Sequence, residues 1–191
     1  PRVLMCCVCG VPARPVLPPL HAGPPPGGDG VKVCTSRGHG VQPCELIDSY
    51  GTDAMRIYER FMGPLEAMKP WSSKSVEGIT RFLDRVWRLF TNEDGTLAVT
   101  KDEPSLEANR VLHQTIAKVT ADLEALKFNT AIAQMMVFVN EMYKLETRSR
   151  AVLEPFVLVL SPFAPHLGEE LGELLGHEDT NAYAPGPDAR K

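Results

Sequence analysis

Residues 50–90, YGTDAMRIYERFMGPLEAMKPWSSKSVEGITRFLDRVWRLF, decide the fold of this 191-residue chain. Their apolar residues recur every three or four positions, which is the period of an amphipathic helix. Thr52 or Asp53 can cap a first helix, Gly63-Pro64 ends it, and a second helix runs from about Ser75 to Thr91. The positions expected to be buried are Ala54, Ile57, Tyr58 and Phe61 in the first helix and Ile79, Phe82, Leu83, Val86, Trp87 and Phe90 in the second.

The same period continues downstream of this stretch. A long helix follows Ser105, Asn129 can cap the next one, and a final helical pair spans 150–176 with a break at Ser161-Pro162. No segment of comparable length has the alternating period of a strand. We therefore expect an all-α, up-down helical bundle. Its further core positions are Leu112, Ile116, Val119, Leu123 and Leu126, followed by Ile132, Met135, Met136, Val139, Met142 and Tyr143.

Residues 1–30 have a different composition from the helical part. They contain eight Pro and five Gly without a period, which predicts disorder. All five cysteines lie at or before Cys44, and Cys6 and Cys9 have the spacing of half a zinc knuckle. The second half of such a site is absent, so we expect reduced thiols rather than zinc.

Several segments of the chain resemble leucyl-tRNA synthetases of the bacterial or organellar type, which are class I aminoacyl-tRNA synthetases. Residues 50–90 are similar to the segment that leads from the catalytic core of those enzymes into their helical tRNA-binding domain. Residues 125–132, 139–144 and 160–170 resemble later helices of the same domain. The family usually has tryptophans at two positions where this chain has Gly172 and Gly186.

Upstream, residues 32–43 resemble the KMSKS signature loop, which closes over ATP in this family. Lys32 matches its first lysine, and Ser36 and Arg37 match its end. Thr35 occupies the position of the second lysine, and a neutral side chain cannot stabilise the charge on a departing pyrophosphate. The HIGH signature that completes the ATP site is not present. The resemblance thus implies ATP as the family's cofactor, but we expect this chain alone neither to bind it nor to catalyse aminoacylation, and we assign no catalytic residue.

A row of basic residues predicts contact with nucleic acid. Residues 31–91 hold nine Lys/Arg and seven Asp/Glu, a balance of +2, whereas residues 92–191 hold nine and sixteen, a balance of −7. Arg81, Arg85 and Arg88 recur along one side of the second helix, with Lys74 near its start. Arginines at this spacing can grip successive phosphates, although a solvated helix face looks the same in sequence. The resemblance implies binding of the body of leucine tRNA, tRNA(Leu), rather than of its anticodon.

Four segments are expected along the chain. Residues 1–30 are disordered, 31–49 are the remnant of the ATP loop, 50–178 form the bundle, and 179–191 are a disordered tail or the start of a further domain. No apolar run is long enough to span a bilayer, so we expect a protein of the cytoplasm or an organelle matrix without a membrane partner.

Two functional interpretations remain open from the sequence. In the first, the chain is a carboxyl-terminal fragment or divergent relative of a leucine–tRNA ligase that supplies tRNA docking, and a separate chain can carry the catalytic core. In the second, it is a stand-alone, non-catalytic helical module that binds RNA or another protein.

Overall fold

The computed structural model describes residues 43–63, 72–146 and 148–189. Within these ranges all regular elements are helices, accompanied only by two isolated β-bridges, which confirms the predicted all-α class. No helix in the described part is long and apolar enough to cross a membrane. The helices are α1 (Pro43–Tyr50), α2 (Thr52–Phe61), α3 (Ser73–Phe90), α4 (Leu106–Glu124), α5 (Phe128–Lys144), α6 (Arg150–Leu160) and α7 (Pro165–Leu174), followed by the short 3-10 helix η2 (Asn181–Tyr183).

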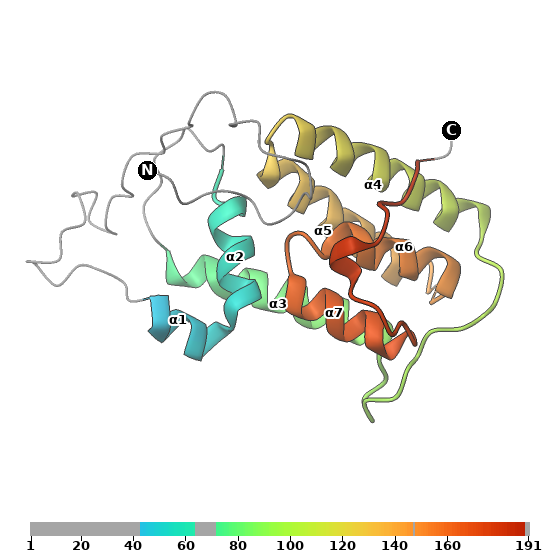
Figure 1. The fold of residues 1–191 in the computed structure, drawn as a ribbon, viewed down its shortest axis with the longest axis horizontal. Helices are drawn as coiled ribbons and strands as arrows, with labels where there is room; N and C mark the ends of the chain where they lie inside the picture. The colour runs from blue at the N-terminus through green and yellow to red at the C-terminus, as the bar shows by residue number, and fades with distance from the viewer. Residues whose placement is uncertain (1–42, 64–71, 147, 190–191) are drawn as a thin grey trace, which may run out of the picture.

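Helix α5 is the central element of the bundle. It packs along α4 and also contacts α2 and α3, while α6 packs between α4 and α7. Figure 1 shows α1 and α2 at the left end of the molecule and α4 along the upper right, with α5 between α2 and α4. The turn between α4 and α5 is short, so the two helices run antiparallel, as expected for an up-down bundle.

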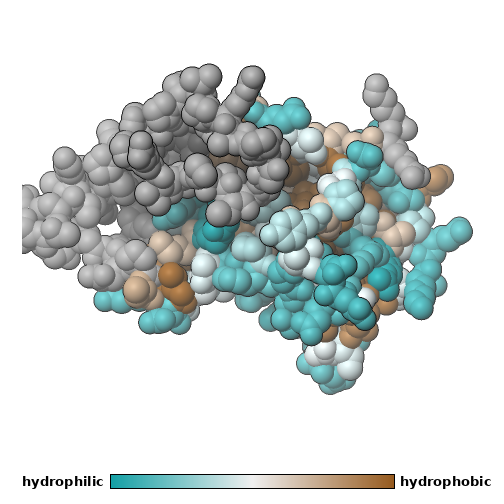
Figure 2. Space-filling model, in the orientation of Figure 1, coloured by the Kyte–Doolittle hydropathy of each residue, from teal (hydrophilic) through white to brown (hydrophobic). Residues whose placement is uncertain are grey.

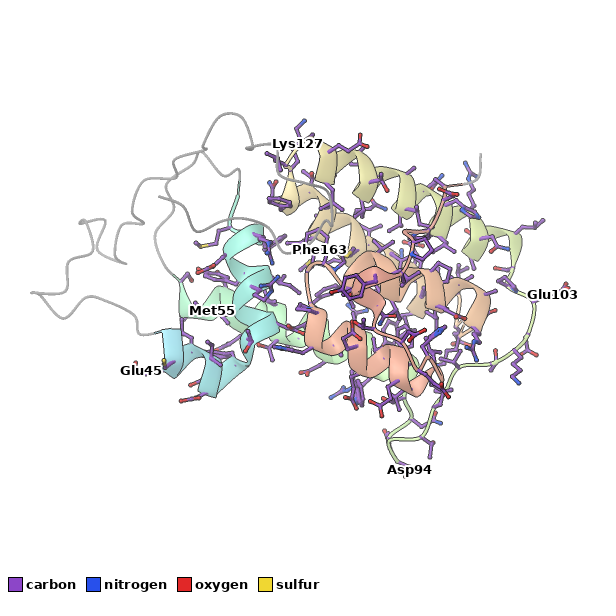
Figure 3. All side chains as sticks on the ribbon, in the orientation of Figure 1. Glu45, Met55, Asp94, Glu103, Lys127 and Phe163 are labelled. Carbon is purple, nitrogen blue, oxygen red and sulfur yellow. The ribbon has the colours of Figure 1, made fainter. Side chains whose placement is uncertain are left out.

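One continuous apolar core joins these helices. Phe138 of α5 stacks on Phe156 of α6 with ring centroids 4.3 Å apart, and Phe128 meets Phe163 edge-on at 6.4 Å. Such aromatic pairs contribute about 0.5–1.5 kcal/mol beyond the area that they bury. Figure 3 labels Phe163 in the turn between α6 and α7. Most of the predicted core positions are buried or half-buried, including all three methionines predicted in α5.

Two predicted core residues are exposed instead. Phe61 retains 36% of its accessible surface because α2 ends there, and Leu126 retains 41%. Leu126 lies beyond the end of α4 with φ of 56°, in the left-handed region. This conformation closes the helix with a hydrogen bond from Lys127 N to Asp122 O of 2.7 Å, and it turns Leu126 out of the helical period. In α3 the buried face also includes Leu89, which is 2% exposed and was not among the predicted core positions.

Helix ends agree with the sequence at α4 and α7 but differ at α2 and α5. The Ser105 hydroxyl accepts a hydrogen bond from Ala108 N at 3.1 Å, and Gly176 follows α7 with φ of 88°. In contrast, Gly51 is the N-cap of α2, and Lys127 rather than Asn129 precedes α5. Each predicted cap lies one or two residues inside its helix.

Asp53, predicted as a cap of α2, serves another helix. Its side chain is buried in the first turn of α2 and accepts a hydrogen bond from Leu167 N, in the first turn of α7, at 2.8 Å. The preceding residue Ala164 offers no side-chain cap. The prediction was wrong because a carboxylate can reach the N-terminus of a neighbouring helix as well as its own. His166 lies beside Asp53 and is exposed.

The segment boundaries can be compared with the structure in part. Helix α1 occupies Pro43–Tyr50, where the end of the loop remnant was expected. After α7, the Asn181 amide donates to Gly168 O at 2.7 Å and the Thr180 hydroxyl donates to Glu169 at 2.8 Å, so these two residues are attached to α7. They belong to the segment 179–191, for which a disordered tail or the start of a further domain was expected. Residues 1–30 lie outside the described ranges.

Candidate nucleic-acid interface

Helix α3 presents a basic face because its apolar residues are all on the opposite side. Val76, Ile79 and Val86 are almost completely buried against the rest of the bundle. The intervening positions therefore face solvent, and the predicted contact residues Lys74, Arg81, Arg85 and Arg88 are all exposed. With Glu77 and Asp84 as its only acidic residues, α3 has four positive and two negative side chains, a balance of +2.

Direct ion pairs do not neutralise this face within the described part of the chain. Glu77 lies four residues before Arg81, and Asp84 lies four residues before Arg88, which is favourable spacing for helical ion pairs. Neither pair comes within the 4.0 Å distance of a salt bridge, whereas three other Lys/Arg–carboxylate pairs on α4, α5 and α6 do. The charge of Arg81 and Arg88 thus remains available to a polyanion.

Arg85 has a different environment from the other two arginines. Its Nη1 donates to the Oδ1 of Asn140 on α5 at 2.6 Å. Its guanidinium carbon lies 4.8 Å from the ring centroid of Tyr143, in cation–π geometry. The Tyr143 hydroxyl in turn donates to the carbonyl oxygen of Arg85 at 2.9 Å. These contacts fix the guanidinium between α3 and α5.

A notch of about 440 Å³ accompanies these contacts on the surface between α3 and α5. Lys144 and Glu141 also line it and form an ion pair with Nζ and Oε1 2.6 Å apart. Val137 contributes an exposed apolar wall. With two basic residues and one acidic residue, the notch keeps a balance of +1 and is suited to an anionic group.

A second, larger hollow of about 590 Å³ lies between α6, α7 and η2, and its charge is opposite. Glu154, Glu178 and Asp179 line it together with His177. Burial raises the pKa of Glu154, but the hydrogen bond and charge of Arg150 and the neighbouring His177 outweigh burial and hold that pKa below its ordinary value. Figure 2 shows that the face carrying α7 and η2 is largely hydrophilic. This acidic hollow is unsuited to a nucleic-acid backbone.

The remaining predicted site residues belong to the ATP-loop remnant and to the half zinc knuckle. Lys32, Thr35, Ser36 and Arg37 of the ATP-loop remnant lie outside the described ranges, as do Cys6 and Cys9. Among the described residues, no group of three or more His, Cys, Asp or Glu side chains could hold a metal ion. Cys44 has a free, exposed thiol.

The contacts of Asn140 and Tyr143 with Arg85 were not predicted. Tyr143 was expected in the core stripe of α5, and it is half-buried there with its hydroxyl reaching Arg85. Asn140 is exposed. One feature of the sequence could have indicated Asn140: it is a polar residue beside the apolar positions of α5. It also lies within residues 139–144, which resemble the synthetases.

Comparisons with known proteins agree on one family. Residues 106–191 match the family model described as the anticodon-binding domain of tRNA ligase. The chain is 51% identical over 164 residues to a leucine–tRNA ligase of Chloroherpeton thalassium, a match that covers 85% of this chain and 20% of that protein. It is also similar, with a TM-score of 0.74 and 31% identity, to the synthetase in the crystal structure of the ternary complex of Agrobacterium radiobacter K84 agnB2 LeuRS–tRNA–LeuAMS, covering 85% of this chain and 23% of that one. The chain therefore spans about a fifth of the length of these relatives.

Proposed function

We propose that this chain, as the helical anticodon-binding domain of the leucine–tRNA ligase family, docks the body of leucine tRNA on the basic face of α3. The observation that supports the proposal most is that Arg81, Arg85 and Arg88 are exposed on one face and form no ion pair with a carboxylate in the described part of the chain. Planar guanidinium groups at successive helical turns suit successive phosphates of an RNA backbone. Lys74 extends the same face toward the start of the helix.

The reaction that this docking serves is proposed from the relatives. A leucine–tRNA ligase uses ATP to activate leucine as its adenylate and then transfers the leucyl group to the end of the tRNA. In this scheme Lys32, Ser36 and Arg37 belong to the loop that closes over ATP, and Thr35 gives that loop one positive charge fewer. Groups that bind leucine and the rest of ATP lie outside these 191 residues, in the same polypeptide or in a separate chain.

Charge reversal on α3 tests the docking surface. A variant with Arg81, Arg85 and Arg88 all changed to Glu is compared with one in which Lys101, Arg110 and Lys127, which lie outside α3, are changed to Glu. Both variants change the net charge equally, so a general electrostatic effect would weaken both alike. We expect the α3 variant alone to lose binding of a leucine tRNA transcript in a filter-binding assay. Equal binding by the α3 variant and the wild type would contradict the proposal and favour a helical module with another partner.

A further inference from the structure

The three arginines of α3 are not equivalent, and the difference comes from α5. Arg81 and Arg88 are exposed, and their side chains make no hydrogen bond, ion pair or ring contact with another helix among the described residues. Arg85 is exposed as well, but Asn140 and Tyr143 on the neighbouring helix α5 hold its guanidinium. Asn140 and Tyr143 lie 55 and 58 residues away from Arg85 in the sequence.

We propose that Asn140 and Tyr143 are positioning residues that preorganise Arg85 to grip one phosphate of the RNA at the notch between α3 and α5. This inference rests on the proposed docking of tRNA and adds that two residues of α5 hold one of the docking arginines in position. Arg85 uses one guanidinium nitrogen, Nη1, on Asn140, and its other N–H groups have no acceptor among the described residues. A phosphate oxygen at the notch would complete their hydrogen bonding.

The advantage of this arrangement is entropic. A long exposed side chain loses rotamer freedom when it binds a phosphate, and this loss subtracts from the gain of the contact. In Arg85 the side chain is already confined by a 2.6 Å hydrogen bond on one edge and an aromatic ring beneath its plane. Arg85 therefore contributes more to RNA affinity than Arg81 or Arg88, although all three carry the same charge.

The notch also shows which RNA feature fits. Lys144 lies beside Arg85 but is paired with Glu141 at 2.6 Å, so the site is weakly positive rather than strongly basic. A carboxylate at its edge would repel a cluster of phosphates and tolerate a single one. The binding unit at the notch is accordingly one phosphodiester of the backbone, which carries no base specificity.

A double-mutant cycle between Asn140 and Arg85 tests the inference. Asn140 is exposed, so Asn140→Ala leaves the core intact. It should weaken binding of a leucine tRNA transcript by roughly twofold to tenfold. In the Arg85→Ala background the same substitution should have no effect, because nothing is left to position. An Asn140→Ala effect that persists without Arg85, or that is absent in the wild type, overturns the inference.

A second readout does not depend on RNA. In NMR spectra the Nε–H group of Arg85 should have a higher order parameter than those of Arg81 and Arg88, and Asn140→Ala should remove the difference. Tyr143→Phe, which keeps the ring beneath the guanidinium, should retain more order than Tyr143→Leu. Equal order parameters for all three arginines in the wild type overturn the inference as well.

These outcomes are distinguishable from failure of the proposed function. If the α3 charge reversal abolishes tRNA binding while Asn140→Ala changes nothing, the docking surface stands and only the positioning role is lost. If the charge reversal has no effect, the docking proposal fails first. Arg81→Lys and Arg88→Lys serve as matched controls for Arg85→Lys, since the loss of a planar fork should reduce affinity most at Arg85, where Asn140 and Tyr143 hold that fork in place.

Discussion

The carboxylate of Asp53 in α2 caps the N-terminus of α7 by accepting a hydrogen bond from Leu167 N at 2.8 Å. The two residues are 114 positions apart, and the carboxylate lies where the helix dipole favours negative charge. Because α7 has no side-chain cap of its own, this contact ties the first part of the bundle to its last long helix.

We predict that Asp53→Ala lowers the free energy of unfolding by about 1–2 kcal/mol, the usual effect of removing a capping side chain. Asp53→Asn should lose less, since an amide oxygen still accepts the hydrogen bond but carries no charge. Thermal denaturation followed by circular dichroism measures both changes. An Asp53→Ala protein with the melting temperature of the wild type would show that the contact contributes nothing.

Gly168 in α7 lies close to Ser161 at the end of α6, so we expect an added methyl group at Gly168 to destabilise the bundle. A Cβ there would lie 3.0 Å from Ser161 Cα and 3.1 Å from Ser161 Cβ, and backbone cannot move aside as a flexible side chain can. Gly168→Ala should therefore destabilise the bundle by about 1–3 kcal/mol. Gly78 in α3 is the matched control, since a Cβ there meets nothing within 4 Å and Gly78→Ala should stabilise by about 0.5–1 kcal/mol. Denaturant titration of the two variants should give changes of opposite sign.

At Gly172 the neighbour is a side chain, so the expected result differs. A Cβ at Gly172 would lie 2.5 Å from Nδ2 of Asn181, the atom that donates to Gly168 O at 2.7 Å. Gly172→Ala should displace Asn181 and lose a hydrogen bond worth about 1 kcal/mol, offset by a similar gain in helix propensity. We expect little change in global stability but faster amide exchange at Asn181, measured by hydrogen–deuterium exchange. If exchange at Asn181 is unchanged, the segment is held by its other contacts.

The environment of Glu154 predicts a loss of stability in acid. Its folded-state pKa lies below the unfolded value, so the stabilisation is fully present above the ordinary glutamate pKa of about 4.3 and is lost as pH falls through the folded pKa. Arg150 Nε and His177 Nε2 lie 2.9 Å and 2.6 Å from its carboxylate oxygens. Glu154→Gln should reduce stability by up to about 1 kcal/mol at neutral pH and converge with the wild type in acid. If the difference in free energy of unfolding between the two proteins stayed constant with pH, the Glu154 carboxylate would not be the source of the stabilisation.

Salt dependence provides a quantitative test of the α3 surface. If each arginine displaces one counterion from tRNA, the logarithm of the affinity should fall against the logarithm of salt with a slope of about −0.7 to −0.9 per contact. Changing Arg81, Arg85 and Arg88 to Glu should therefore flatten the slope by about two to three units. The control variant of Lys101, Arg110 and Lys127 should keep the slope of the wild type. An unchanged slope in the α3 variant would place the phosphate contacts elsewhere.

The sequence by itself determined the helical class, the positions of most helices and the exposed row of basic residues. These features are local, because the period of 3.6 residues in apolar positions and helix-breaking pairs such as Gly63-Pro64 depend only on residues that are close in the sequence. The prediction that Phe61 and Leu126 are buried was wrong because both residues lie at helix ends. Beyond a helix end, the helical period no longer determines which side chains face the core.

Only the tertiary structure decided which polar side chains meet. Asp53 reaches Leu167, and Arg85 reaches Asn140, across separations of 114 and 55 residues. A hydrogen bond between distant residues does not change the sequence pattern around either partner. Each side chain, taken alone, could equally cap its own helix or face solvent. The packing of α5 against α3 and of α7 against α2 brings those groups within bonding distance, and it thereby distinguishes Arg85 from the two arginines beside it.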